Sequence, residues 1–203
     1  MANNNKFKIL AFDPGLTSTG WSLIEGDIES RDVVVLKVGE LHPGQLADRA
    51  MFRDEVGKFD KRVVTLRLLR EGVTKLLDEI RPDLVCAEDI FINPRRPQAY
   101  GGLCMWTAVV RMHCRDVAGK YLVSIPTKIC KQVVTGRGDI GKITVQQAIA
   151  AHPHIRFKDP NDLAHITEHQ ADSIAVGMAL LDRYHDLIVK EVKERNERRT
   201  TQS

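Results

Sequence analysis

The chain has 203 residues, of which 43% are hydrophobic and 28% are charged, and its formal net charge is +3. This balance is typical of a globular protein with a sizeable core, and the net charge alone does not indicate a nucleic-acid-binding protein. No apolar run approaches the roughly 20 residues that cross a bilayer, and the start Met-Ala-Asn-Asn-Asn-Lys lacks a signal peptide's apolar core. We therefore expect a cytoplasmic protein without a membrane span.

The opening of the chain predicts three strands joined by short links. Residues 8–12 (KILAF) form an apolar run closed by Asp-Pro-Gly, and residues 20–25 and 33–38 are two further strand-like runs. Short links favour an antiparallel meander. Residues 41–61 have weak periodicity and are interpreted as a connection with some helix.

The remainder alternates helical and strand-like segments. Apolar residues at helical spacing occupy residues 62–80, and Arg-Pro-Asp then ends that helix before a buried strand. The sequence thus predicts one α/β domain over residues 1–193, in which a mixed central sheet of three antiparallel leading strands plus parallel strands is flanked by helices. Residues 194–203 are predicted to be a disordered, charged tail. The remaining expected elements are strands 84–87 and 121–125, helices 99–118, 127–134 and 142–151, a loop at 153–161, and a final helix from about 167 into the 190s.

The four cysteines indicate neither a disulfide framework nor zinc. Cys86, Cys104, Cys114 and Cys130 form no CxxC pair, and no Cys/His grouping has the spacing of a structural zinc site. We expect reduced, mostly buried thiols.

Two acidic residues follow buried strands. Asp13 ends the first strand before Pro-Gly, and Glu88 follows the run LVCA directly. Asp13 alone is compatible with an ordinary turn, whereas an ionised Glu88 at a buried strand end is costly unless it is paired or metal-bound. We favour Glu88 over Asp89 because we assign it the inward face of Val85 or the strand end, although alternation alone does not decide between them. Ligands of such sheets gather at the carboxyl ends of strands.

A third acidic group lies on the predicted last helix. His165, Glu168, His169 and Asp172 recur at offsets of three and four residues, which places them on one stripe of that helix. The alternative is a solvated first turn whose acids favour the helix dipole. A divalent cation would turn the repulsion between Glu168 and Asp172 into attraction. Together with Asp13 and Glu88, this stripe predicts an oxygen-rich site for two Mg²⁺ ions, with Mn²⁺ as a substitute, suited to phosphodiester hydrolysis.

Four segments resemble the RuvC family of Holliday junction resolvases, which have a ribonuclease-H-like fold. LAFDPGLTSTGWSLIE is similar to that family's first strand, catalytic aspartate and second strand, and LVCAEDIFINPR to its second motif. CKQVVTGRGDIGK is similar to its basic segment, and EHQADSIAVGMAL to its final acidic helix. Each segment alone is weak evidence, but all four occur in the family order over residues 8–182.

The resemblance implies three metal-binding carboxylates, Asp13, Glu88 and Asp172. The family's fourth acidic position corresponds to His169, a histidine that some members also carry, with Glu168 as the competing candidate. A neutral imidazole at this position would bind metal or assist proton transfer.

The resemblance also assigns DNA contacts. Phe91 corresponds to an aromatic residue that stacks on bases at an opened junction, with core packing as the alternative. Lys131 and Lys142 align with lysines needed near the scissile phosphate, with solvated surface lysines as the alternative. The expected phosphate-contacting residues are Arg95, Arg96, Lys128 and Arg137.

The family implies a homodimer that nicks opposed strands of a four-way junction and leaves 5′-phosphate and 3′-hydroxyl ends. The apolar residues Met105, Trp106, Val109 and Met112 are compatible with a dimer interface or with core packing. A phosphotransferase of the actin and sugar-kinase type shares the first motif, but it would need a second phosphate loop that the chain lacks. A non-catalytic junction-binding protein and a relaxed nuclease of branched DNA are also compatible with these motifs.

Overall fold

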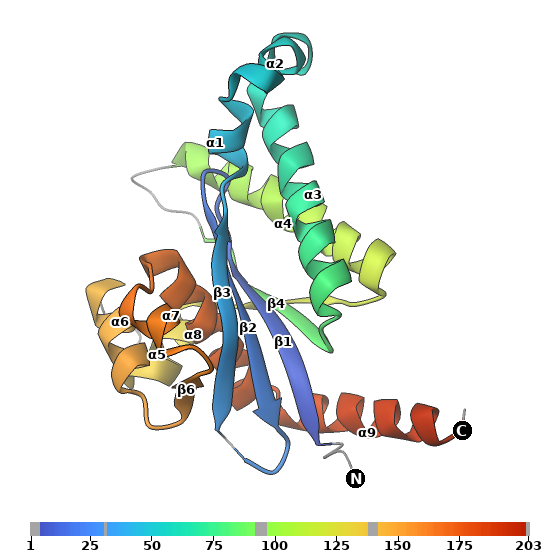
Figure 1. Cartoon of the computed structure of the whole chain (residues 1–203), viewed down its shortest axis with the longest axis vertical. Helices are drawn as coiled ribbons and strands as arrows, with labels where there is room; N and C mark the ends of the chain where they lie inside the picture. The colour runs from blue at the N-terminus through green and yellow to red at the C-terminus, as the bar shows by residue number, and fades with distance from the viewer. Residues whose placement is uncertain (1–4, 31, 92–96, 138–141, 202–203) are drawn as a thin grey trace.

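A single mixed sheet of six strands crosses the computed structural model, which describes residues 5–30, 32–91, 97–137 and 142–201 (Figure 1). The strand order is β5-β4-β1-β2-β3-β6. The first three strands form the predicted antiparallel meander, and β4, β5 and β6 run parallel to β1, β4 and β3, respectively. The strands are β1 (Lys6–Asp13), β2 (Thr19–Asp27), β3 (Val33–Leu41), β4 (Leu84–Glu88), β5 (Leu122–Ile125) and β6 (Ile155–Phe157).

Helices cover both faces of this sheet, with α3 and α4 on one face and α5, α6 and α8 on the other (Figure 1). None of the described helices is long and apolar enough to span a membrane. The helical segments are α1 (Pro43–Ala47), the 3-10 turn η1 (Ala50–Phe52), α2 (Arg53–Phe59), α3 (Lys61–Ile80), α4 (Pro97–Ala118), α5 (Thr127–Thr135), α6 (Lys142–Ala151), α7 (Pro160–Ala164), α8 (Glu168–Arg183) and α9 (His185–Thr201).

Strand alternation divides the core into two layers. Ile9 and Ala11 of β1 pack on the side of α8, whereas Leu10 and Phe12 pack on the side of α3 and α4. In the second layer, the rings of Phe12 and Trp106 meet edge to face with their centroids 5.8 Å apart. By the same alternation, Phe12 faces α3 and α4, whereas Asp13, the last residue of β1, faces α8.

The helix α8 lies directly on the centre of the sheet. Its stretch of small and aliphatic residues is buried, and a Cβ at Gly177 would lie 2.4 Å from Cδ1 of Ile24. Thr167 caps the helix, because its hydroxyl accepts from the Gln170 N–H while the Gln170 side chain accepts from the Thr167 N–H. This close packing and the cap fix the first turn of α8 at the end of the sheet where β1 ends.

Three segments differ from expectation. Residues 41–61 are largely helical, and the predicted loop at 153–161 contains β6, whose three residues are too few to show an alternating pattern. The predicted last helix is two helices separated at Tyr184, and helical structure continues to Thr201, beyond the boundary placed at residue 193. The four thiols are free, and three of them are buried, as predicted.

Candidate active site

Asp13 and Glu88 lie beside each other at the ends of two neighbouring parallel strands. Ala11 of β1 pairs with Cys86 of β4, so Asp13 and Glu88 are each two residues further along. Both side chains face α8, because they alternate with Phe12 and Ala87 of the opposite layer. Of the two positions expected for Glu88, the strand end is confirmed, because Glu88 is the last residue of β4. The face of Val85 was wrong: Glu88 is three positions after Val85, so it shares the face of Leu84 and Cys86.

Asp89 is excluded from this arrangement. It follows the last residue of β4, its side chain is exposed, and its carboxylate accepts a hydrogen bond from the Ile90 N–H at 3.0 Å. The preference for Glu88 over Asp89 therefore agrees with its position at the strand end, although not with a face shared with Val85.

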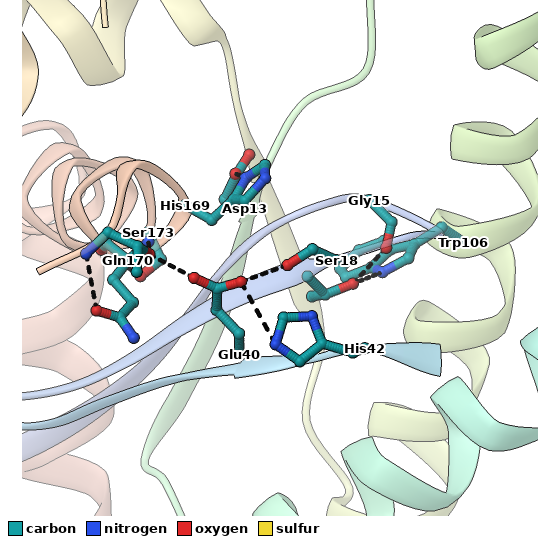
Figure 2. A network of polar contacts seen from close by, with 11 residues as sticks. Asp13, Gly15, Ser18, Glu40, His42, Trp106, His169, Gln170 and Ser173 are labelled. Atoms are coloured by element: carbon teal, nitrogen blue, oxygen red, sulfur yellow. Dashed lines mark hydrogen bonds and ion pairs between the residues drawn. The ribbon is translucent and has the colours of Figure 1, made fainter. Parts of the chain in front are cut away.

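His169 brings the first turn of α8 into contact with Asp13. The Nδ1 atom of His169 lies 2.6 Å from Oδ2 of Asp13, and the two side chains are 37% and 9% exposed (Figure 2). Gly20 of β2 permits this approach, since a Cβ there would lie 2.1 Å from the backbone oxygen of His169. Of the two candidates for the fourth position, His169 is thus the one with a described contact to Asp13.

The pKa of Glu88 responds to three other residues predicted for this site, Asp13, Asp172 and Lys131. Burial, and after it the charge of Asp13, raises the pKa of Glu88 to about 8. The charge of Asp172 raises this pKa further, while the Thr127 hydroxyl and Lys131 lower it. Asp13, Asp172 and Lys131, which come from β1, α8 and α5, therefore all act on the Glu88 carboxyl group.

The carboxylates of this site are ligands that suit a hard divalent cation, although they are not yet arranged at coordination distance around one point. Within the described part of the chain, no three histidine, cysteine, aspartate or glutamate side chains already form a metal-ligand cluster. The Thr127 hydroxyl oxygen is buried beside Glu88 and makes no hydrogen bond of normal geometry among the described residues. Carboxylate oxygens that repel one another and raise the pKa of Glu88 are the ligands that Mg²⁺ and Mn²⁺ prefer.

Two buried hydroxyl and indole contacts fix the turn that follows Asp13. The Thr19 hydroxyl donates to the Gly15 carbonyl oxygen at 2.6 Å, and Nε1–H of Trp106 donates to the Thr19 oxygen at 2.9 Å. Thr19 and Trp106 are both fully buried. Sequence reasoning did not find this link, because Thr19 and Trp106 are 87 residues apart and only the fold joins them.

Glu40, near the end of β3, is an acidic residue of the site that sequence reasoning also missed. Its carboxylate accepts from the Ser18 hydroxyl at 2.5 Å and from the Thr167 hydroxyl, and it lies 3.7 Å from Nε2 of His42 (Figure 2). Burial would raise the pKa of Glu40, but these two hydrogen bonds and the charges of His169 and His42 outweigh it and lower the pKa. Its strand-end position was the available signal.

The predicted DNA-contacting residues are only partly described. Phe91 is 57% exposed, so core packing is not its role. Lys128 is exposed in the first turn of α5, and Arg137 is exposed two residues after that helix ends. Lys131 is half-buried and acts on Glu88. Arg95 and Arg96 lie outside the described residues, as does the side chain of Lys142, the first residue of α6.

Comparisons with known proteins agree with this arrangement. A family model described as "Crossover junction endodeoxyribonuclease RuvC" matches residues 9–180. A relative of the same name from Trichlorobacter lovleyi is 30% identical over 173 residues, which cover 80% of this chain and 86% of the relative. A second from a Caulobacter species is 28% identical over 149 residues, covering 73% of this chain and 78% of the relative.

Solved structures show the same fold at lower identity. RuvC of Thermus thermophilus in complex with a Holliday junction substrate has a TM-score of 0.64 and 17% identity, covering 85% of this chain and 92% of that one. The yeast mitochondrial Holliday junction resolvase Ydc2 has a TM-score of 0.61 and 11% identity, covering 90% and 83%. The fold is the predicted ribonuclease-H-like fold of these resolvases. Since the family model spans most of the sequence, the chain belongs to the RuvC family of crossover junction endodeoxyribonucleases.

Proposed function

We propose that this protein is a structure-selective DNA endonuclease that resolves four-way junctions by paired nicks in opposed strands. The observation that carries the proposal is the convergence of Asp13 and Asp172 on the partly buried Glu88, whose pKa is raised to about 8. Burying several carboxylates together is unfavourable unless the site serves a cation or an acid–base step. The family membership of the chain supplies the class of reaction.

The residues that would hold the metal are Asp13, Glu88, Asp172 and His169, with two Mg²⁺ ions per site and Mn²⁺ as a substitute. Bound there, such ions supply an activated water and offset the charge that develops on the phosphate and the leaving oxygen. His169 would exchange its contact with Asp13 for a place in this set, which the partial exposure of its ring permits. We assign Glu168 no ligand role.

Other residues would hold and orient the DNA. Lys131 lies close enough to influence Glu88, so its ammonium group is suited to a phosphate oxygen at the reacting centre, and we assign Lys142 the same role. Exposed Phe91 would stack on an unpaired base at the junction centre. Hydrolysis would leave 5′-phosphate and 3′-hydroxyl ends. The proposed phosphate contacts along the arms are Lys128, Arg137, Arg95 and Arg96.

We further propose that the active form is a homodimer, because a two-fold axis places two sites against two opposed strands. Met105 and Met112 are exposed one heptad apart on α4, while Trp106 is core. Val117 of α4 is exposed as well, and we propose that a partner would cover the two methionines. We also propose that the protein acts where its DNA substrate lies, in the bacterial cytoplasm, or in the host cytoplasm for a phage-encoded protein.

The direct test is incubation of the purified protein with a synthetic mobile four-way junction in Mg²⁺ and in EDTA, beside a linear duplex of the same sequence. We expect symmetrical nicks in the junction in Mg²⁺ only, and products that a ligase can seal. Cutting of flaps and forks at the same rate would indicate a relaxed branch nuclease. Binding without cutting in any divalent metal would indicate a non-catalytic protein, and ATP hydrolysis without DNA would indicate a phosphotransferase.

A further inference from the structure

Four positions form one row across the sheet at the active-site end. Asp13 of β1 pairs with Gly20 of β2, and Gly20 pairs with Glu40 of β3, while Glu88 of β4 lies on the other side of Asp13. Paired positions in a sheet direct their side chains to the same face. The row therefore directs the carboxylates of Glu88, Asp13 and Glu40 toward α8. Gly20, between Asp13 and Glu40, has no side chain, and the backbone of His169 lies over this position.

Glu40 occupies this row without belonging to the proposed ligand set. Each of its carboxylate oxygens accepts from a hydroxyl of a different segment: Oε2 from Ser18, in the turn between β1 and β2, and Oε1 from Thr167. The side chain is 13% exposed. Figure 2 shows Glu40 between Ser18 and the start of α8, with the pair of His169 and Asp13 close by.

Glu40 is hydrogen-bonded to the N-cap residue of α8, Thr167. The Thr167 hydroxyl accepts from the Gln170 N–H at 3.2 Å, and the Thr167 carbonyl accepts from the Ala171 N–H at 3.0 Å. His169 directly precedes these two residues in the chain, so the cap fixes its backbone. A carboxylate at this point also favours the N-terminal end of the helix dipole.

We propose that Glu40 is a positioning residue, which ties the first turn of α8 to the turn after β1 so that His169 and Asp172 face Asp13. The inference rests on the proposed nuclease function. Glu40 acts through its hydrogen bonds with Thr167 and Ser18, neither of which is a proposed ligand. A carboxylate suits this role because it accepts two hydrogen bonds from two segments, whereas an amide supplies one acceptor oxygen and no charge.

The expected effect is on the cleavage step. Glu40→Ala should lower the single-turnover rate of junction cleavage by about 10- to 100-fold, since small misplacements of catalytic groups have costs of this size. Junction affinity measured in EDTA should be unchanged. Glu40→Gln should fall between wild type and Glu40→Ala. Glu25→Gln is the matched control, because Glu25 is also a strand glutamate with a 2.7 Å ion pair, to Lys6, away from this end of the sheet.

A double-variant cycle separates positioning from a general structural role. Thr167→Val removes the donor, whereas Thr167→Ser keeps the hydroxyl and should behave as wild type. If Glu40 acts through the cap, the variant carrying both Glu40→Ala and Thr167→Val should be no slower than the slower single variant. Multiplied rate losses in the double variant would overturn the proposal.

A readout independent of cleavage distinguishes this inference from the proposed function. Amide hydrogen exchange of Gln170 and Ala171 should become faster in Glu40→Ala and Glu40→Gln, while the exchange of amides in α3 stays unchanged. If wild type cuts no junction but this exchange responds, the nuclease proposal fails and the tie between Glu40 and α8 stands. Unchanged exchange in both variants, or a junction affinity that falls as much as the rate, would overturn the positioning role.

Discussion

Asp13→Asn is expected to lower the single-turnover rate of four-way junction cleavage by about 10³-fold, corresponding to the several kcal/mol that a metal site contributes. Asparagine has the size of aspartate and can still accept a hydrogen bond from His169, so the fold should be retained. Asp13 is buried at the end of β1. Junction affinity in EDTA should therefore be retained or improved, because one negative charge near the phosphate has been removed.

Asp83→Asn provides the control for this substitution. Asp83 lies just before β4, at the opposite end from Glu88, and its carboxylate accepts from the Lys8 N–H of β1 at 2.8 Å. An amide oxygen can accept the same hydrogen bond, so cleavage should proceed at the wild-type rate. Wild-type cleavage by Asp13→Asn would show that the nuclease centre has been assigned to the wrong residue.

Glu88→Gln is expected to abolish cleavage and to stabilise the metal-free protein at alkaline pH. Because the folded-state pKa of Glu88 is raised from 4.5 to about 8, the contribution of this group to stability is full below about pH 4.5 and is lost as pH rises from there through 8. Glutamine has no proton to lose. The melting temperature of Glu88→Gln in EDTA should match that of wild type near pH 4.5. Near pH 9 it should exceed that of wild type by at least a few degrees, since about 1 kcal/mol shifts Tm by about 2–4 °C.

Added metal should reverse this difference. Near pH 8, Mg²⁺ or Mn²⁺ should raise the melting temperature of wild type, because a bound cation favours the ionised carboxylate, and should raise that of Glu88→Gln much less. Glu25→Gln should respond to metal as wild type does. Identical melting curves for Glu88→Gln and wild type across this pH range would mean that burial and the charges of Asp13 and Asp172 do not act on Glu88.

The sequence was sufficient to predict the residues whose surroundings are local. An apolar run followed by a breaker marks the end of a buried strand, which located Asp13 and Glu88, and helical spacing located His169 and Asp172 on one turn. Parallel neighbours end at the same edge of a sheet, so the convergence of Asp13 and Glu88 followed from the fold class. The family resemblance then supplied the reaction class.

Residues whose role depends on strand register or helix packing could not be predicted from the sequence. Glu40 faces α8 only because β2 pairs with β3 in a register that shifts between Leu23 and Ile24, and turn lengths alone do not reveal such an irregularity. The hydrogen bond from Trp106 to Thr19 depends on how α4 crosses the sheet. The face of Glu88 was misassigned for a related reason. Because β4 is buried on both faces, its continuous apolar run does not indicate which residues share a face.

The central claim is that Asp13, Glu88 and Asp172 jointly hold divalent cations. Anomalous diffraction from crystals of the protein soaked in Mn²⁺ tests it most directly, with crystals of Asp13→Asn as the control. We predict manganese peaks coordinated by oxygens of all three carboxylates in wild type, and weakened or lost peaks in the variant. Crystals that bind Mn²⁺ elsewhere and leave these three carboxylates without metal would contradict the claim.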